Sequence, residues 1–381
     1  MKFIHLSDLH LGKRVNGFSM LEDQEYILKK ILQTVDAEKP DAVVIAGDVY
    51  DKSVPSAEAV TLLDDFLCDL AKRDLQVLLI AGNHDSAERL AFGGRLLSAS
   101  GVHISPVYRG NVAPVTLTDA FGPVHFWLLP FVKPAHVRAF LPEEAAEAAA
   151  TYTDALRAAI EAMALDSSQR NVLVCHQFVT GAARSDSEDV SVGGLDNVDA
   201  AVFDGFDYVA LGHLHGPQSV GKETVRYCGT PLKYSFSEKD QEKSLTVVEM
   251  AEKGQLVLRT VPLPPRRDMR EVKGTYDEVV LQGNREGERK ADYMRVVLTD
   301  EEDVPDAIAK LRTVYPNLMN LDYDNVRTRT IGSAGDLPRV EQRSEIELLG
   351  EFYEKQNGQP LSEAQKTYSL ALLEQIREEL A

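Results

Sequence analysis

The stretch Ala42-Val43-Val44-Ile45-Ala46-Gly47-Asp48-Val49-Tyr50-Asp51 decides the fold. Its first part is a short apolar run, which is typical of a buried strand. The glycine then allows the backbone to turn sharply, and Asp48 follows it directly. We therefore expect the carboxylate of Asp48 to project from the carboxyl end of a buried strand.

Four other apolar runs share this design, because each is followed by residues that can ligate a metal. Ligand sites of open α/β sheets lie outside the carboxyl ends of the strands, so five such ends can converge on one cleft. The pattern predicts one dinuclear metal site. The runs are Phe3 to Ser7 before Asp8 and His10, Leu75 to Ala81 before Asn83, His84 and Asp85, Val172 to Cys175 before His176, and Tyr208 to Leu211 before His213 and His215.

The ordered combination of these residues carries the signal, because each alone is weak evidence. A single histidine at a strand end, such as His176, is more often structural, and Asn83 is of a type common in turns. Mixed imidazole and carboxylate ligands suit divalent Mn, Fe or Zn, and a carboxylate can bridge two ions. A closed structural zinc site usually has four ligands, with thiolates among them. Seven candidate ligands without a cysteine therefore favour a catalytic centre.

Over residues 1 to about 240, the chain resembles the calcineurin-like metallophosphoesterases in its ordered motifs. These motifs are DxH, GDxxD, GNHD, a single His and GHxH. The resemblance implies an α/β fold, an αββα sandwich with two metal ions, and Asp48 as the bridging ligand. It also implies that His84 protonates or stabilises the leaving oxygen and that Asp85 orients His84. One metal would be held by Asp8, His10, Asp48 and His215, and the other by Asp48, Asn83, His176 and His213.

Within that family the chain resembles the nuclease component of bacterial SbcCD complexes, at FIHLSDLHLG (Phe3 to Gly12) and YCGTPLKYSFSE (Tyr227 to Glu238). This resemblance implies a nuclease with two Mn²⁺ ions that acts on DNA in repair, recombination and replication. The implied activities are a double-strand 3′–5′ exonuclease and a single-strand or hairpin endonuclease, gated by ATP through the SMC-like ATPase SbcC. It further implies a homodimer within a heterotetramer, with helices near residues 56–73 and 87–98 at the dimer interface.

The chain departs from archaeal and eukaryotic relatives at Asp51, where those proteins carry a histidine. A second catalytic histidine is therefore absent at this position. We expect Asp51 to support the site by hydrogen bonding.

The sequence predicts three parts. Residues 1–262 should form the metallophosphoesterase nuclease domain, and a Pro-rich stretch from Val261 to Arg267 follows the strands Leu245 to Glu249 and Leu256 to Thr260. Residues 268–338 should form a smaller α+β unit, which the resemblance implies is a capping domain that contacts DNA. Residues 339–381 should form a helical hairpin, broken at Asn357-Gly358-Gln359-Pro360, and the resemblance implies that it binds SbcC.

Apolar periodicity and breakers predict the remaining elements. Residues 180–199 are acidic and Gly-containing, and are read as a long loop beside His176, either functional or simply flexible. The capping domain should contain strands at Glu278 to Leu281, Met294 to Leu298 and Asn325 to Ile331, and a helix from Val304 to Val314. The first domain should contain helices at Leu21 to Ala37, Ser56 to Arg73, Ala87 to Ser98 and Glu143 to Ala164.

The composition limits the compartments in which the protein can act and the partners that it can bind. Its 381 residues carry a net charge of −19, which argues against a simple nucleic-acid binder and predicts a weak hold on DNA by this chain alone. We expect no secretory signal, and no apolar run reaches the roughly 20 residues that would span a membrane. Three scattered cysteines fit a reducing cytoplasm, and Cys175 is expected to be a buried strand thiol.

Two other functions remain open. A small-molecule phosphodiesterase uses the same motifs but does not need the roughly 140 residues that follow the core. A non-catalytic scaffold subunit would not need every ligand and His84. Protein phosphatases of the superfamily fit less well, because Lys52-Ser53 stands where they carry Arg-Gly.

Overall fold

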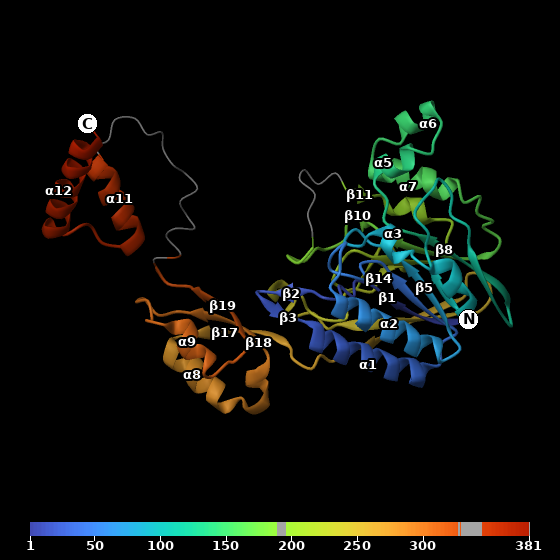
Figure 1. The fold of residues 1–381 in the computed structure, drawn as a ribbon, viewed down its shortest axis with the longest axis horizontal. Helices are drawn as coiled ribbons and strands as arrows, with labels where there is room; N and C mark the ends of the chain where they lie inside the picture. Colours follow the sequence, from blue (N-terminus) through green and yellow to red (C-terminus); the bar gives the residue numbers. More distant parts are fainter. Residues whose placement is uncertain (189–195, 327, 329–344, 381) are drawn as a thin grey trace. The chain divides into compact units, whose positions relative to one another are not determined.

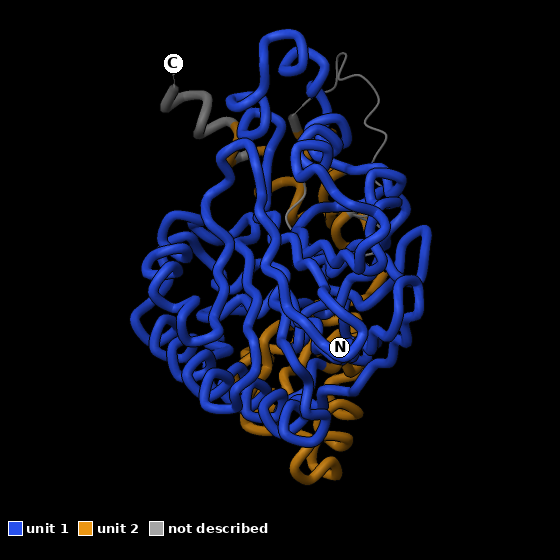
Figure 2. Tube along the Cα trace, turned by 90° about the vertical axis from the view of Figure 1, so that its right-hand side faces the viewer, with its two compact units in different colours: residues 1–269 blue, residues 270–381 orange. Residues whose placement is uncertain are grey.

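The computed structural model describes residues 1–188, 196–326, 328 and 345–380. The chain forms two compact units, Met1–Met269 and Arg270–Ala381, which are coloured separately in Figure 2. Each unit is described by itself.

The first unit contains two six-stranded sheets. In the first sheet, four strands run parallel and two antiparallel strands complete one side. The order is β16 (Leu256–Pro262), β15 (Ser244–Met250), β1 (Lys2–Leu6), β4 (Ala42–Ala46), β5 (Gln76–Ile80) and β6 (Val102–Ile104).

The second sheet also has a parallel centre, with an antiparallel strand at each edge. Its order is β13 (Gln218–Val220), β14 (Lys222–Tyr227), β12 (Tyr208–Gly212), β9 (Arg170–His176), β8 (Gly122–Leu129) and β7 (Val115–Asp119). Two short strand pairs lie outside the sheets: β2 (Arg14–Val15) with β3 (Phe18–Ser19), and β10 (Phe178–Val179) with β11 (Asn197–Val198).

The two sheets pack face to face between layers of helices. Along β9, Val172 and Val174 join the core between the sheets, whereas Leu173 and Cys175 pack on the helix side. This alternation is the period of two that a strand imposes on its side chains. Figure 1 shows α1 (Leu21–Glu38) and α2 (Ala57–Ala71) on one side of the paired sheets, and α5 (Pro134–Arg138), α6 (Glu143–Ala148) and α7 (Tyr152–Glu161) on the other. The predicted αββα sandwich is confirmed, and so is the burial of the Cys175 thiol.

Two predicted helices are each broken in the structure. The segment expected as one helix from Ala87 to Ser98 forms α3 (Ala87–Leu90) and α4 (Gly94–Leu97), because Gly93 between them adopts a left-handed conformation with φ of 73°. The segment from Glu143 to Ala164 forms α6 and α7. Thr151 starts the second of these, because its side chain accepts a hydrogen bond from the backbone of Asp154.

The second unit begins with a three-stranded sheet, ordered β17 (Met269–Gly274), β18 (Tyr293–Leu298) and β19 (Leu318–Tyr323). Its core includes Val272, Val296 and Leu311, and the helices are α8 (Tyr276–Arg285) and α9 (Ala307–Arg312). The strand expected at Glu278 to Leu281 is wrong. Those residues lie in α8, because Thr275 and Glu278 form a reciprocal capping box that starts a helix.

The strand expected from Asn325 to Ile331 is not found in its described part either, since Val326 and Thr328 are helical. Residues 327 and 329–331 of that prediction lie outside the described residues. The sheet ends instead with β19, which pairs in parallel with β18.

Two helices follow, α11 (Glu345–Asn357) and α12 (Glu363–Leu380), and they contact each other. They are separated at the predicted breaker, where Gly358 has a φ of 69°. Residues 339–344 and 381 of the predicted tail lie outside the described residues. Nowhere in the described ranges does a helix combine the length and the apolar character that a membrane span requires.

Candidate metal centre

The residues expected at one site follow the carboxyl ends of parallel strands in both sheets. Asp8 and His10 follow β1, Asp48 follows β4, and Asn83 follows β5. Backbone hydrogen bonds tie the first two of these segments together, from Asp8 N to Gly47 O at 3.0 Å and from His10 N to Asp48 O at 2.9 Å. In the second sheet, His176 ends β9, and His213 and His215 follow β12.

Four of these residues hold a backbone conformation that side chains other than glycine rarely adopt. The φ angles are 53° for Asp8, 45° for His10, 46° for Asp48 and 105° for His213. Such conformations persist only where the surrounding structure enforces them, and they gather at functional sites. The strained positions therefore mark this strand edge as a site.

Gly82 shows how closely the backbone must approach these side chains. A Cβ atom at Gly82 would lie 2.1 Å from Oδ1 of Asp48 and 2.3 Å from its backbone nitrogen. No larger residue fits there without displacing Asp48. The glycine expected from the GNHD motif is thus required by the position of this carboxylate.

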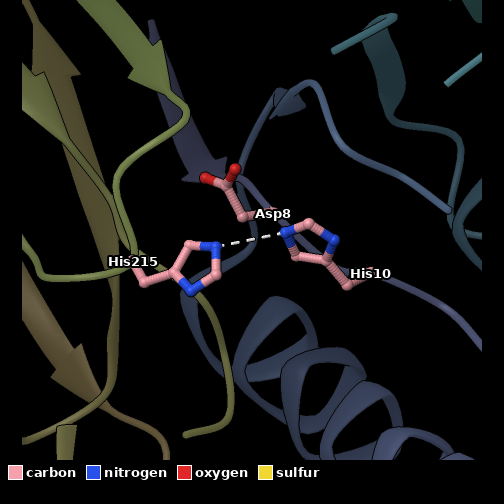
Figure 3. A group of neighbouring side chains, drawn as sticks. All are labelled: Asp8, His10 and His215. Atoms are coloured by element: carbon pink, nitrogen blue, oxygen red, sulfur yellow. Dashed lines mark hydrogen bonds between the residues drawn. The ribbon is translucent and has the colours of Figure 1, made fainter. Parts of the chain in front are cut away.

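The first group of ligand atoms comes from Asp8, His10 and His215, whose donor atoms lie within 4.8 Å of one another. Figure 3 shows the two imidazoles pointing toward each other, with Nε2 of His10 3.2 Å from Nε2 of His215. Ligand nitrogens lie about 2.1 Å from a bound zinc ion, so two nitrogens at this separation can reach a single ion of that kind. The carboxylate of Asp8 is held by the backbone N–H of His213, at 3.0 Å and 3.2 Å.

The second group centres on Asn83. Its Oδ1 atom lies 2.9 Å from Nε2 of His176 and 2.9 Å from Nδ1 of His213. His176 donates its other ring N–H to the carbonyl oxygen of Ala46 at 2.9 Å, which leaves the lone pair of Nε2 for coordination. A fixed partner on the second ring nitrogen is usual for a metal-binding histidine.

Asp48 lies between the two groups. Its Oδ2 atom is 3.3 Å from Nε2 of His176 and 3.7 Å from Nε2 of His10. Asp48 therefore has the position expected of a bridging ligand, and the structure brings all seven sequence-predicted ligands together. The buried carboxylate and imidazole donors suit divalent cations.

The electrostatics of the centre follow from burial and from these neighbours. Burial opposes ionisation of Asp48, but the imidazoles of His176, His10 and His84 lower the pKa of its carboxyl. Burial likewise opposes the charge of His176, yet Asp48 raises its pKa to about 9. Burial lowers the pKa of His213 to about 3. The centre thus pairs an ionised carboxylate with a protonated His176, and a metal ion would take the place of the proton on Nε2 of that ring.

His84 lies beside Asp48 and is half-buried. Its Nδ1 atom lies 3.1 Å from the carbonyl oxygen of Asp51, and a carbonyl only accepts, so Nδ1 carries a proton there. Its Nε2 atom lies 3.9 Å from Oδ2 of Asp48. The ring therefore presents Nε2 toward the metal ligands.

The carboxylate of Asp85 contacts the backbone of both loops. Its carboxylate accepts backbone N–H groups from Gly82 at 2.9 Å, Val49 at 3.1 Å and Tyr50 at 2.9 Å. Burial, and then the charge of Asp48, raise its pKa to about 6. Asp85 fixes the two loops that carry Asp48 and Asn83, while the carbonyl of Asp51 holds Nδ1 of His84.

The side chain of Asp51 contacts the site as well. Lys13 donates to its Oδ1 atom at 2.7 Å, and that oxygen lies 3.6 Å from Nδ1 of His10. Asp51 therefore holds His84 through its backbone carbonyl, whereas its carboxylate lies beside the ring of His10 without a hydrogen bond to it.

A buried network around His215 escaped the sequence analysis. Nδ1 of His215 lies 2.6 Å from Oγ of Ser187, which donates to Glu238 at 2.5 Å, and Lys243 donates to Glu238 at 2.5 Å. Glu188 accepts the backbone N–H of His215 at 2.7 Å. Ser187 and Glu188 belong to the predicted loop 180–199, of which residues 189–195 lie outside the described residues. Of the residues in this network, Glu238 could have been found from the sequence, because it lies in the YCGTPLKYSFSE stretch that carries the resemblance.

Comparisons with known proteins match both parts of the chain. The family model described as Calcineurin-like phosphoesterase matches residues 1–217, and the one described as Type 5 capsule protein repressor C-terminal domain matches residues 265–357. The chain is 35% identical to the D subunit of the nuclease SbcCD from Staphylococcus epidermidis, over 96% of both chains. It is 33% identical to the protein of the same name from Staphylococcus saprophyticus, over 95% of both. A dimetal phosphatase structure from Danio rerio, 11% identical, covers 69% of this chain and 98% of its own, with a TM-score of 0.43.

Proposed function

We propose that DNA is the substrate of this chain, which belongs to the calcineurin-like phosphoesterase family and is a metal-dependent phosphodiester hydrolase. The proposed activities are a double-strand 3′–5′ exonuclease and a single-strand or hairpin endonuclease, serving repair, recombination and replication. Support comes from relatives called nuclease subunits, which match the chain over nearly its whole length. A second unit beyond the catalytic sandwich also fits a large substrate better than a small one.

One observation carries the chemistry: the carboxylate of Asp48 lies between a ligand of each group, 3.7 Å from Nε2 of His10 and 3.3 Å from Nε2 of His176. Two divalent ions held there would polarise a phosphate and lower the pKa of a water molecule. The protein's part is to fix the ligands, since Asp8 and His176 are each held by a backbone group. His84 turns Nε2 toward the metal ligands, and once its ring is protonated it can give the Nε2 proton to the leaving oxygen and keep the Nδ1 proton on the Asp51 carbonyl.

The metal proposed is Mn²⁺ at both positions. Its support is the donor set, which mixes imidazoles with carboxylates and an amide oxygen and contains no thiolate. Other divalent ions with the same preferences are the alternative. Calorimetric titration of the purified chain with Mn²⁺, Mg²⁺ and Zn²⁺ would rank them.

The proposed substrate is tested with end-labelled linear duplex DNA and Mn²⁺, comparing wild type with Asp48→Asn. We expect degradation by wild type only, because the variant loses the carboxylate that lies between the two groups. Asp204→Asn is the matched control, since Asp204 is an exposed carboxylate paired with Lys222 away from the centre. Degradation by Asp48→Asn at the wild-type rate would place the nuclease chemistry elsewhere.

The same assay separates the two other candidates. A small-molecule phosphodiesterase would hydrolyse bis(p-nitrophenyl) phosphate but leave DNA intact, with or without an added ATPase partner. A scaffold subunit would hydrolyse neither, although it could still bind metal.

We further propose that the SMC-like ATPase SbcC binds the helical pair α11 and α12 and gates the nuclease with ATP. The support is an apolar surface on these helices, where Phe352 is 62% exposed and Tyr368 is 70% exposed. Exposed apolar side chains grouped on two helices favour a partner. Deleting residues 339–381 should abolish co-purification with the ATPase and leave the metal titration unchanged. Retained co-purification would refute this assignment.

We propose that two copies of the chain form a homodimer within a heterotetramer, with α2, α3 and α4 at the interface between the copies. Phe92 is 85% exposed, Leu96 is 81% exposed, and Phe92 borders a cavity of about 660 Å³ lined also by Val60. Phe92→Glu should convert the dimer to a monomer in light scattering. An unchanged mass would place the interface elsewhere.

The β17–β19 unit is proposed as a capping domain that contacts DNA, and its support is its place after the catalytic sandwich, as in the resemblance. We place the enzyme in the cytoplasm, because Cys68, Cys175 and Cys228 are free thiols, which a reducing compartment maintains.

A further inference from the structure

A cavity of about 560 Å³ lies beside the metal centre, on the side of Asn83. Its lining includes Gly82, Asn83 and Asp85 from the loop after β5, and Pro130 and Phe131 from the segment after β8. These two strands belong to different sheets, and the N–H of Phe131 donates to the carbonyl of Ala81 at 2.9 Å across them. The cavity therefore opens at the carboxyl ends of the strands, where the ligands of α/β folds bind.

The cavity borders the metal centre at two residues. Asn83 lines the cavity, and its Oδ1 atom contacts both His176 and His213. Phe131 lines the cavity too, and its ring meets the ring of His176 edge to face, with centroids 6.2 Å apart. A group attached to a phosphate at the centre can thus enter the cavity directly.

Two aromatic side chains, Tyr108 and Phe140, form part of the cavity wall. Phe140 is 50% exposed, and its ring packs edge-on against that of Tyr108 at 6.0 Å. Gly110 lies behind it, where a Cβ atom would come within 2.8 Å of Cβ of Phe140. Phe140 is therefore held in place with half of its surface open. An aromatic ring presented in this way stacks well on a flat heterocycle.

A positive charge and a polar rim complete the cavity. Lys133 is exposed, and no acidic partner meets its ammonium group within the described part of the chain. Such a cation is notable beside the catalytic centre of a chain with a net charge of −19. Glu88 and His136 also line the cavity and offer hydrogen bonds to a polar ring. A volume of this size suits a ligand as large as a nucleotide.

We propose that this cavity is a nucleoside subsite: it receives the base and sugar next to the phosphate held at the metal centre, with the base stacked on Phe140 and the backbone charge met by Lys133. The inference rests on the proposed function, because it deepens the assignment of DNA as substrate. It predicts that recognition there is by stacking, so any of the four bases is accepted.

The test is direct binding of dAMP to the full-length chain, measured by calorimetry with Mn²⁺ present, with inorganic phosphate as the second probe. Wild type should bind dAMP about tenfold more tightly than phosphate, as expected for one stacked base. Phe140→Ala should remove that difference and leave phosphate binding unchanged, whereas Phe140→Trp should keep it. Lys133→Gln should weaken dAMP binding about threefold, the loss of one partly screened charge contact.

The matched control is Phe121→Ala, since Phe121 is exposed to the same degree, 53% against 50%, but lies in the turn between β7 and β8. Equal dAMP affinity for wild type and Phe140→Ala would overturn the subsite, and so would equal affinities of wild type for dAMP and phosphate. Thermal melting verifies that each variant is folded.

The outcomes of this experiment distinguish a failure of the subsite proposal from a failure of the proposed function. DNA degradation by wild type, together with dAMP binding that ignores Phe140, would leave the nuclease standing and remove the subsite. A loss of dAMP binding in Phe140→Ala, in a chain that leaves DNA intact, would support the subsite for a smaller nucleotide substrate.

Discussion

Nδ1 of His84 lies 3.1 Å from the carbonyl oxygen of Asp51. The backbone N–H of His84 also donates to Oδ1 of Asp48, at 2.9 Å. The loops after β4 and β5 thus fix the histidine twice, once through its ring and once through its backbone. This arrangement places a proton on Nδ1 and turns Nε2 toward the metal ligands.

The first prediction concerns His84. Replacing it with Ala should lower hydrolysis of a phosphodiester about 100- to 10,000-fold, the usual contribution of a general acid. The stoichiometry of bound Mn²⁺, measured by calorimetry, should not change. His125→Ala is the control, because His125 lies on β8 and its Nδ1 atom is 2.8 Å from Oγ1 of Thr116 on β7, at the far edge of the sheet. Wild-type turnover in His84→Ala would refute the role.

The second prediction concerns the network behind His215. Ser187→Ala removes the group that accepts the Nδ1 proton and leaves the Glu238 to Lys243 ion pair intact. Metal affinity at the Asp8, His10 and His215 group should fall about 10- to 100-fold, as for other partners of metal-binding histidines.

Titration calorimetry should then show one Mn²⁺ ion that binds more weakly than in wild type and one that binds with wild-type affinity. Glu238→Gln should act in the same direction, and Glu249→Gln, at an exposed carboxylate on β15, serves as its control. Two unchanged equivalents, or two equally weakened ones, would contradict a role specific to His215.

The third prediction concerns Gly82. Gly82→Ala places a methyl group where Oδ1 of Asp48 lies, so the loop or the carboxylate must move. We expect loss of metal binding at both positions and a lower melting temperature. Gly94→Ala should be tolerated, since its Cβ would lie 3.5 Å from the nearest atom, an ordinary contact. Normal metal binding in Gly82→Ala would show that the close approach is not required.

The fourth prediction concerns stability and pH. Arg170 is 4% exposed and donates to both carboxylate oxygens of Asp119, at 3.0 Å and 2.6 Å. It also donates to the carbonyl of Ala251 at 2.8 Å, beyond the end of β15 in the other sheet. Asp119→Asn should therefore lower the free energy of unfolding by about 2 kcal/mol at pH 7, less than the full value for a buried pair because the carboxylate is partly exposed.

Hydrogen bonds from Arg170 hold the pKa of Asp119 below its usual value. The stabilisation is then complete above the unfolded pKa of about 3.9 and is lost as the pH falls through the lower folded value. Urea unfolding can be monitored by the fluorescence of the single tryptophan, Trp127. The difference in free energy of unfolding between wild type and Asp119→Asn should become smaller below about pH 4. A gap that is constant, or that widens in acid, would contradict the prediction.

Local sequence determined the strands and the residues that follow them. The runs before Asp8, Asp48 and His176 are short and apolar, and their pattern needs no knowledge of distant residues. The breaker at Gly358 was equally local. The strand ends then predicted a common site, because parallel strands present their carboxyl ends at one edge, and the resemblance to a known family supplied the αββα sandwich.

The errors arose where two local signals competed. The apolar Val279 and Val280 resemble a strand, but the capping box of Thr275 and Glu278 starts a helix whose buried face includes Val279. In the segment from Ala87 to Ser98, helical periodicity continued through Gly93, whose left-handed conformation divides it. Periodicity alone does not decide between such outcomes.

Only the tertiary structure decided which atoms meet. His215 contacts Ser187, 28 residues away in the chain, and Ser187 contacts Glu238, a further 51 residues away, and no periodic pattern links them. The same holds for the carbonyl of Asp51 at His84, since a backbone group leaves no trace in residue identity. The sequence by itself determined the candidate ligands of the centre, because each follows its own strand. Their mutual distances, and the cavity beside Asn83, were decided by how the two sheets pack, since that packing depends on the whole core at once.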